Sequence, residues 1–164
     1  MKKVQSQTTT TKVAILGKLP TKYKAPFNDT EWEIWSVNKH SDEANIPRVD
    51  LWFDLHFEPY KKNADFTRDN FPFDDIEKMV GGHYFNNTIS YLIGYAILKG
   101  YKEIALYGMA FTTPAEQKIK QYENVRELIF FAKGKGIKVT APFDKRMVEQ
   151  YPLYTQEYVA NKPK

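Results

Sequence analysis

The sequence contains no cysteine, so it has no disulfide framework, no thiolate metal site and no cysteine nucleophile. No apolar run approaches the ~18 residues that cross a bilayer, and the lysine-containing N-terminus lacks the apolar segment of a secretory signal. These absences predict a protein without membrane contact in a reducing, cytoplasmic setting. Hydrophobic residues at 42% and charged residues at 27% are ordinary globular values, which excludes wholesale disorder.

Arginine is also scarce: 20 of the 24 basic residues are lysines. The 24 basic and 20 acidic residues together give a net charge of +4. Much of that excess lies at the two ends of the chain. A small, scattered charge favours solubility over a nucleic-acid surface, so nucleic acid is not the expected partner. The lysines at 118, 120, 133, 135 and 138 leave a basic face open as a third hypothesis. The sequence leaves a homo-oligomer open as well.

Short apolar segments alternate with helical patterns along the chain. Strand composition occupies residues 12–17, 31–37, 49–55, 103–107 and 137–140. Helices are expected after Pro72 and over 88–99, 114–133 and 144–149. The alternation predicts an α/β fold: a single Rossmann-like three-layer sandwich around a mostly parallel five-stranded sheet. We expect a flexible arm at 1–11, the domain at 12–151 and a C-terminal tail at 152–164.

Ligands bind at the carboxyl ends of the strands in such sheets, near the point where strand order reverses. After the first strand, Gly17 lets backbone amides approach a phosphate, and Lys18 and the Thr21 hydroxyl add donors. A tight turn with a solvated lysine explains these residues equally well. The loop has neither a GxGxxG nor a Walker A motif, so neither NAD binding nor ATP hydrolysis is predicted. Gly108 occupies the corresponding position after the fourth strand.

Polar residues follow the second and third strands. The amide of Asn38 could contact a base or ribose, although capping of a helix near Ser41 is an alternative. Asp54, His56 and Glu58 alternate within five positions and form the best metal or acid–base cluster available. Such a cluster does not by itself supply convergent metal ligands. We therefore predict no metal and no cofactor, and we nominate His56 as a candidate base.

The start of the helix at 88–99 is a third polar region. Asn86, Asn87 and Thr88 could present side chains or N-terminal amides to an anion, and N-capping is the competing explanation. His83, in the loop just before it, is the second candidate base. Tyr107 at the end of the fourth strand is the aromatic side chain most readily assigned to ligand stacking.

Residues 86–111 (NNTISYLIGYAILKGYKEIALYGMAF) resemble the helix–strand core of the bacterial sialyltransferases of glycosyltransferase family 42. That family has a Thr-Ser-Gly helix start, a Tyr one turn on, a Gly-Tyr-Lys connection and a strand ending in Gly-Ile-Asp-Phe. Residues 13–21 and 35–38 resemble its strand before Gly-Asn-Gly-Pro-Ser and its strand ending in Arg-Cys-Asn. The resemblance implies a cytidine nucleotide-sugar pocket, used without a metal, that is lined by Gly17, Lys18, Thr21, Asn38 and Thr88.

The sequence also departs from that family. Lys18-Leu19 replaces Asn-Gly, Ala110 replaces an Asp, and the segment EQKIKQ at 116–121 lacks the expected catalytic His. The paired tyrosines of the family's lid are not evident after Phe111. The WEIW-x-x-N and LYG signatures resemble Rossmann-like proteins of tailed phages, which would place this chain in a host cytoplasm.

We therefore predict a nucleotide- or nucleotide-sugar-binding protein of glycosyltransferase type. If it is active, it transfers a sugar from an activated donor, with His83 or His56 as base. The alternative is a non-catalytic nucleotide-sequestering or protein-interaction module that kept the fold and lost the chemistry.

Overall fold

The computed structural model describes residues 10–38, 40–111 and 116–149. Residues 1–9 of the predicted arm and the whole predicted tail lie outside these ranges. The described part contains strands β1 (Lys12–Leu16), β2 (Trp32–Val37), β3 (Leu51–Asp54), β4 (Phe66–Thr67), β5 (Glu103–Tyr107) and β6 (Lys138–Thr140). Its helices are α1 (Phe73–Val80), α2 (Thr88–Leu98) and α3 (Glu116–Gly134), with 3-10 turns η1 (Pro20–Lys24), η2 (Glu43–Asn45) and η3 (Lys145–Met147).

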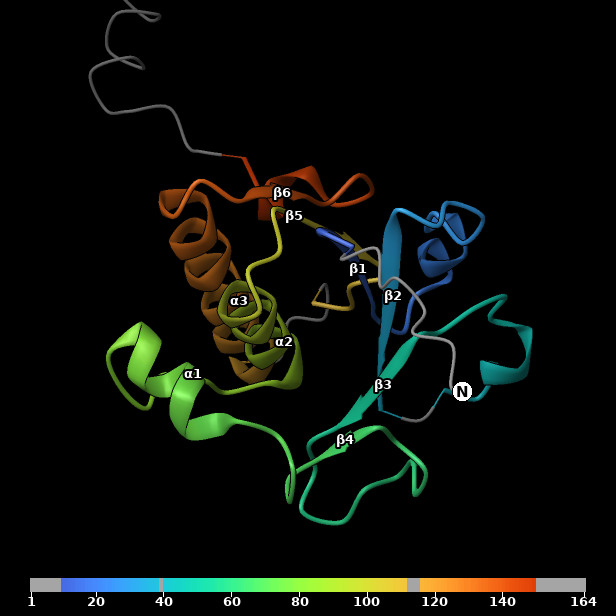
Figure 1. Cartoon of the computed structure of the whole chain (residues 1–164), viewed down its shortest axis with the longest axis horizontal. Coiled ribbons are helices and arrows are strands. Elements are labelled where there is room, and N and C mark those ends of the chain that lie inside the picture. Colours follow the sequence, from blue (N-terminus) through green and yellow to red (C-terminus); the bar gives the residue numbers. More distant parts are fainter. Residues whose placement is uncertain (1–9, 39, 112–115, 150–164) are drawn as a thin grey trace, which may run out of the picture.

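The strands form one sheet in the order β4-β3-β2-β1-β5-β6, and every neighbouring pair is parallel (Figure 1). The predicted α/β fold with a parallel, Rossmann-like sheet is therefore confirmed. The predicted number of strands is wrong, because the sheet has six strands and not five. The missed strand is β4, which has two residues in a polar stretch and so leaves no apolar run to detect. The chain moves outward from β1 to β4 and then crosses back to β5, which places the reversal of strand order at β1.

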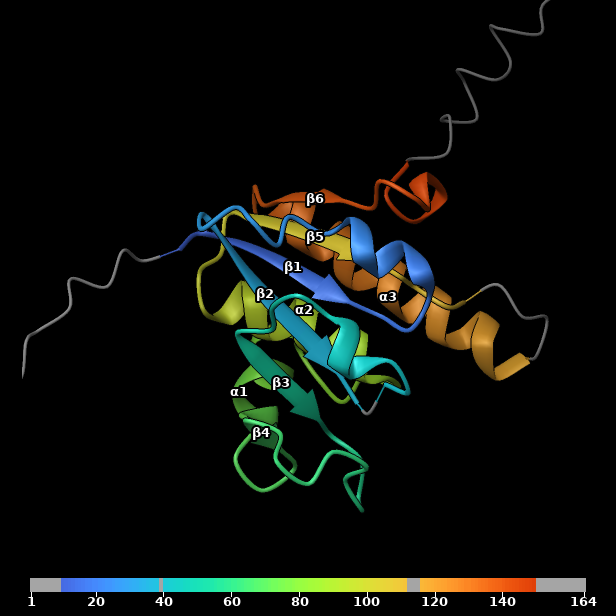
Figure 2. The same ribbon diagram turned by 90° about the vertical axis from the view of Figure 1, so that its right-hand side faces the viewer.

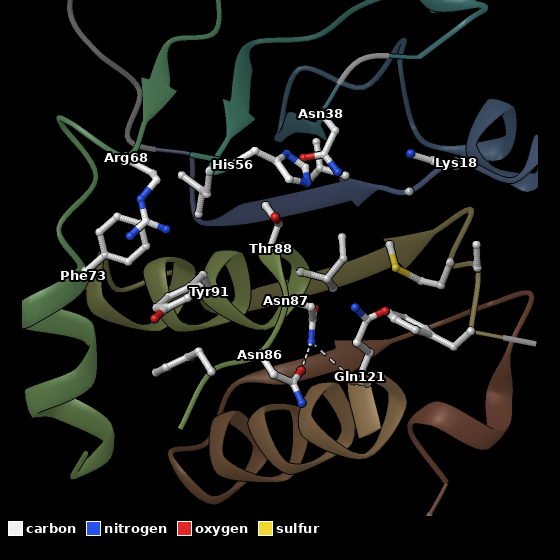
Figure 3. A pocket seen from close by; sticks show the side chains of 18 of the residues that line it. Lys18, Asn38, His56, Arg68, Phe73, Asn86, Asn87, Thr88, Tyr91 and Gln121 are labelled. Atoms are coloured by element: carbon white, nitrogen blue, oxygen red, sulfur yellow. Dashed lines mark hydrogen bonds between the residues drawn. The ribbon is translucent and has the colours of Figure 1, made fainter. Parts of the chain in front are cut away.

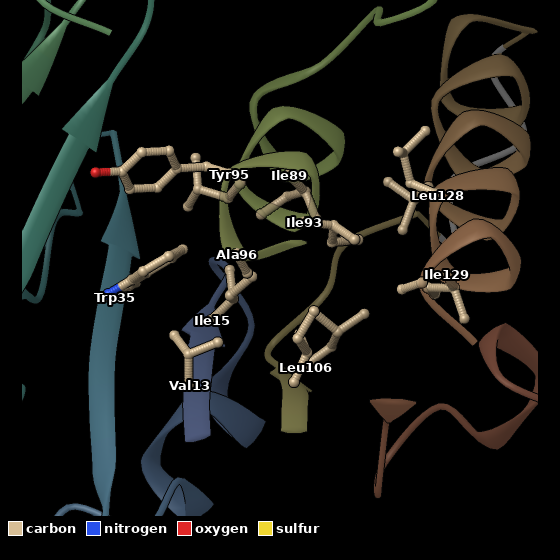
Figure 4. Packing of buried hydrophobic residues seen from close by; sticks show 14 of the residues in the cluster. Val13, Ile15, Trp35, Ile89, Ile93, Tyr95, Ala96, Leu106, Leu128 and Ile129 are labelled. Carbon is tan, nitrogen blue, oxygen red and sulfur yellow. The ribbon is translucent and has the colours of Figure 1, made fainter. Parts of the chain in front are cut away.

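The two faces of the sheet are covered differently (Figure 2). All three α-helices lie on one face, and the connections that contain η1 and η2 cover the other. Side chains of a strand alternate between faces, so Val13 and Ile15 of β1 enter the main core while Ala14 and Leu16 enter a smaller cluster. The main core joins the sheet to α2 and α3 (Figure 4).

Helix α2 packs on the sheet and contacts both α1 and α3. Eight of its 11 residues are buried, which confirms the prediction from its apolar sequence that it lies inside a sandwich. Gly94 allows α1 to approach, because a Cβ at this position would lie 2.6 Å from Cγ2 of Ile76. The two helices therefore pack closely at this point. The N-terminus of α2 lies at the carboxyl edge of the sheet.

The helix predicted at 144–149 is wrong, since only the short turn η3 forms there. Side chains of α3 hold this segment: Arg126 donates to the carbonyl oxygens of Arg146 and Glu149, and Lys133 donates to that of Val148. These contacts hold the segment along α3. They also give its carbonyl oxygens the hydrogen-bond donors that backbone N–H groups would provide in a longer helix. Among the helices that the structure describes, none combines the length and apolar character needed to cross a membrane.

Candidate functional site

A cavity of about 900 Å³ opens at the carboxyl edge of the sheet, beside the reversal of strand order (Figure 3). Its wall takes residues from the segments after β1, β2, β3, β4 and β5, from α1, and from the N-terminal turns of α2 and α3. The predicted site residues that line it are Gly17, Lys18, Asn38, His56, His83, Asn87 and Thr88. Thr21 and Gly108, which were also predicted to bind the nucleotide, are not among its lining residues.

The loop after β1 is bonded to the loop after β5. The N–H groups of Gly17 and Leu19 donate to the carbonyl oxygens of Tyr107 and Gly108, at 2.7 and 2.9 Å. The Thr21 hydroxyl accepts the N–H of Gly108 at 3.2 Å, and a Cβ on Gly17 would lie 2.3 Å from the oxygen of Gly108. The expected role of the loop amides as a phosphate cradle is therefore wrong for these two N–H groups. Gly17, Thr21 and Gly108 instead bring two loops into contact.

A buried lysine, Lys22, forms a further set of contacts with the same loop. The Lys22 side chain is 1% exposed, and its ammonium lies 2.8 Å from Oδ1 of Asp42, 3.3 Å from Nδ1 of His40 and 3.3 Å from the carbonyl oxygen of Lys18. Lys22 and then Tyr23, which donates its hydroxyl, lower the pKa of Asp42 to about 2. Burial and the charge of Lys22 lower the pKa of His40. This network, which the sequence analysis missed, joins the loops after β1 and β2.

Asn38 directly follows β2 and has a left-handed conformation, with φ of 55°. Its N–H donates to the carbonyl oxygen of Phe53 at 2.8 Å, and its own carbonyl accepts the indole N–H of Trp52 at 2.6 Å. The proposed capping role is wrong, because η2 begins only at Glu43. Within the described residues, Oδ1 of Asn38 is buried and has no hydrogen-bond partner. A buried amide oxygen is costly to leave unpaired, so the pocket retains an unmet acceptor here.

His56 is oriented by a buried carboxylate. Asp54 is 0% exposed, and its Oδ1 accepts Nδ1–H of His56 at 2.6 Å while its Oδ2 accepts the N–H of Lys61 at 2.8 Å. The ring of Tyr60 contacts the imidazole edge to face, with centroids 4.6 Å apart. The His56 side chain points into the pocket (Figure 3). Because Nδ1 is held by the carboxylate, Nε2 is the ring nitrogen available to a ligand.

His83 and Glu58, which were also predicted to take part in acid–base chemistry, are less suited to it. His83 lines the pocket, but its side chain is 93% exposed and its Nδ1 lies 2.5 Å from Oε2 of Glu77. Glu58 is exposed and does not line the pocket; the alternation of a strand does not reach it, because β3 ends at Asp54. In the part of the chain that the structure describes, no three His, Cys, Asp or Glu side chains form a group that could hold a metal ion.

The N-terminus of α2 is fixed by asparagines. Oδ1 of Asn87 accepts the N–H of Ser90 at 3.0 Å, and its Nδ2 donates to Oδ1 of Asn86 at 2.8 Å. Asn124 of α3, which is buried, accepts the N–H of Asn86 and donates to the carbonyl of Tyr84. Capping therefore explains the side chain of Asn87. Thr88 and Ile89 face the pocket at the helix start, where N–H groups have no acceptor within the helix.

Sequence reasoning missed several lining residues. Arg68 follows β4, and its guanidinium lies 4.3 Å from the ring of Phe57 and 5.6 Å from that of Phe73. Lys118 and Gln121 enter the pocket from the first turns of α3. The only signal for Arg68 would have been its place after β4, a strand too short to predict.

The assignment of Tyr107 to ligand stacking is wrong. Tyr107 is not a lining residue, and it packs with the smaller cluster and with Phe143. Its neighbour Leu106 enters the main core, so Tyr107 points to the opposite face of the sheet.

Comparisons with known proteins gave no match: no protein-family model, no curated protein and no solved structure matches this chain. The relationship to family 42 sialyltransferases and to phage proteins stays a prediction. The chemistry of the pocket itself therefore has to support any function.

Proposed function

We propose that this chain binds a nucleotide or nucleotide sugar in the pocket and transfers the sugar from it. The observation that supports this most directly is the composition of one cavity at the reversal of strand order. It combines the start of α2, the cations of Lys18 and Lys118, and a histidine oriented by a buried carboxylate. A phosphate needs the first two features, and proton transfer needs the third.

The phosphates of the donor would bind between Lys18, Lys118 and the first turn of α2. The N–H groups of Thr88 and Ile89 and the positive end of the helix dipole favour an anion there. No carboxylate lies within 4.0 Å of either lysine's ammonium group in the part of the chain that the structure describes. Their charges are therefore available to balance the leaving phosphate. A rotation of the Asn38 side chain would bring its buried, unpaired Oδ1 to a donor of the base or ribose.

Transfer would proceed with His56 as the base. Nε2 of His56 takes the proton of the acceptor hydroxyl as its oxygen forms a bond to the anomeric carbon of the sugar. The bond from that carbon to the phosphate oxygen breaks, and its electron pair leaves with the nucleotide. Asp54 stabilises the imidazolium and holds its orientation, so it is a positioning residue. Of the two nominated histidines, we therefore propose His56 and leave His83 outside the chemistry.

Binding is tested first by thermal shift against CMP, CMP-, UDP- and GDP-sugars, NAD and ADP-ribose. A ligand at about 100 times its Kd adds about 2.7 kcal/mol to the free energy of unfolding. We expect one nucleotide class to raise the Tm, and Lys18→Met and Asn38→Gly to abolish most of that rise. Glycine accepts the positive φ at 38, so the second variant removes the amide without backbone strain.

Lys102→Met is the matched control, because Lys102 is exposed and does not line the pocket. If no nucleotide raises the Tm of the folded protein, the proposal is wrong. Turnover is tested next with the bound donor: His56→Gln should lower its rate by about a hundredfold or more while binding persists. Binding without turnover in the unaltered protein would favour the non-catalytic alternative.

A further inference from the structure

The residues that follow the strands lie along the rim in the order of the sheet. Arg68 follows β4, His56 follows β3, Asn38 follows β2 and Lys18 follows β1. Adjacent strands are about 4.8 Å apart, so the strands of Arg68 and Lys18 are separated by about 14 Å. Figure 3 shows Arg68 and Lys18 at opposite ends of the pocket, with His56 and Asn38 between them. As the structure has them, the two cations therefore serve different ends of the pocket.

The guanidinium of Arg68 lies over two aromatic rings. Its Cζ is 4.3 Å from the ring centroid of Phe57 and 5.6 Å from that of Phe73. Such cation–π contacts do not use the N–H donors of the guanidinium, which remain for hydrogen bonds. No carboxylate lies within 4.0 Å of these nitrogens among the residues described. Such a fork matches the two oxygens of a carboxylate or phosphate.

Phe73 packs against the main core, but two other aromatic side chains at this end of the pocket do not. Phe57 is 87% exposed and Tyr60 is 65% exposed, and Tyr60 contacts the ring of His56. Neither ring lines the pocket, so Phe57 packs on the arginine from outside, whereas Phe73 provides an apolar surface within the pocket for the carbon skeleton of a ligand. The same end of the pocket contains the proposed base.

We infer that Arg68 is the anion-binding residue of the acceptor subsite, and that the acceptor is a small hydroxyl compound bearing a carboxylate or phosphate. Arg68 would hold the anionic group, the ring of Phe73 would contact the carbon skeleton, and His56 would receive the proton of the hydroxyl. The assignment as acceptor rests on the proposed transfer reaction. The anion site itself does not depend on it.

The chain offers a direct spectroscopic probe, because it contains only four arginines. The Nε–H signal of Arg68 can be assigned as the one missing from the spectrum of Arg68→Met. We would titrate the full chain with glucuronate, glucose 6-phosphate and glucose. The three probes share a pyranose ring and differ only in the group at C6. The first two separate carboxylate from phosphate recognition, and glucose is the neutral control.

We expect glucuronate or glucose 6-phosphate, but not glucose, to shift the Arg68 signal. Arg68→Met should weaken the binding of that probe by roughly tenfold to a hundredfold, as expected for loss of a charged hydrogen-bond pair. Arg68→Lys keeps the charge without the fork and should recover only part of the affinity. Lys102→Met should leave the affinity unchanged.

Equal responses to all three probes, or unchanged affinity in Arg68→Met, would overturn the anion site. The nucleotide identified by thermal shift provides the second arm. If it binds with the same Kd in Arg68→Met and does not displace the anionic sugar, Arg68 belongs to the acceptor side. If it displaces the sugar and itself shifts the Arg68 signal, the acceptor assignment is wrong. Anionic sugar binding in a chain that binds no nucleotide would retain the anion site and reject the proposed function.

Discussion

The two ends of the pocket are built in opposite ways. At the closed end, defined by Gly17, Thr21 and Gly108, backbone groups bond to one another and the loops touch without room for a side chain. At the open end, defined by His56, Phe57 and Arg68, side chains are anchored on one side and face solvent on the other. The comparison teaches that backbone contacts set the shape of the closed end, whereas the open end is shaped by side chains that remain partly exposed.

The largest effect is expected from Gly17→Ala at the closed end. The new Cβ would lie 2.3 Å from the carbonyl oxygen of Gly108, and that oxygen belongs to backbone that cannot rotate away. The two loops must separate, so we expect a loss of about 3 kcal/mol in the free energy of unfolding. Urea denaturation measures it. Gly134→Ala is the control, since nothing lies within 4 Å of its Cβ, and it should be neutral or slightly stabilising. Equal effects of the two variants would contradict the close approach.

Asp54→Asn tests the anchor of the open end. Asn has one acceptor oxygen, so either the imidazole of His56 or the N–H of Lys61 loses its partner. We expect a loss of about 1–3 kcal/mol in the free energy of unfolding. Turnover of the bound donor should fall with it, and NMR of the ring nitrogens should show that the Nδ1–H tautomer is no longer fixed. An unchanged tautomer would show that Asp54 does not orient His56.

A smaller effect is expected from pH, through the buried network under the closed end. Because burial and Lys22 lower the pKa of His40, the unfolded chain takes up its proton near the ordinary value of 6.5 before the folded protein does. The free energy of unfolding therefore falls as the pH drops below about 6.5. In His40→Gln this decline between pH 7 and 5 should be shallower. Asp42, with its pKa of about 2, titrates below that window. Parallel curves for the two proteins would refute the prediction.

The smallest effect on stability is expected from Phe57→Ala. The ring is 87% exposed, so its removal should change the free energy of unfolding by less than about 0.5 kcal/mol. The binding of the anionic sugar should nevertheless weaken, because Arg68 loses the ring that holds its guanidinium plane. A stability loss comparable to that of Gly17→Ala would show that the open end is part of the packed structure after all.

Much of the fold could be predicted because its strands and buried helix have strong local patterns. The apolar runs at β1 and β5, and the all-apolar α2, are visible without tertiary information. Strand β4 could not be predicted, since its two residues pair only because β3 lies beside them. The turn η3 was predicted as a longer helix because its tether to α3 depends on long-range contacts with Arg126 and Lys133.

The site was predicted where strand ends determine it. Lys18, Asn38 and His56 follow strands that the sequence indicates, and a parallel sheet brings such positions to one edge. Arg68 could not be placed in the site, because β4 is too short to leave a local pattern. Lys118 could not be placed either, because the sequence predicts the helix that carries it but not which side of that helix meets the pocket. Thr21 and Gly108 were misplaced for a different reason. Sequence shows that a loop has glycine and hydroxyl groups, but not whether these face a ligand or another loop.

The two edges of the sheet are formed by its shortest strands, β4 with two residues and β6 with three. An exposed edge strand is a template on which a second chain can add a strand, and its length sets how well that chain is held. At β4, the side chain of Asn70 also accepts the N–H of Thr67 at 2.8 Å, which occupies one of the few donors present. Within the residues that the structure describes, the sheet therefore offers little backbone for edge-to-edge pairing between copies of this chain.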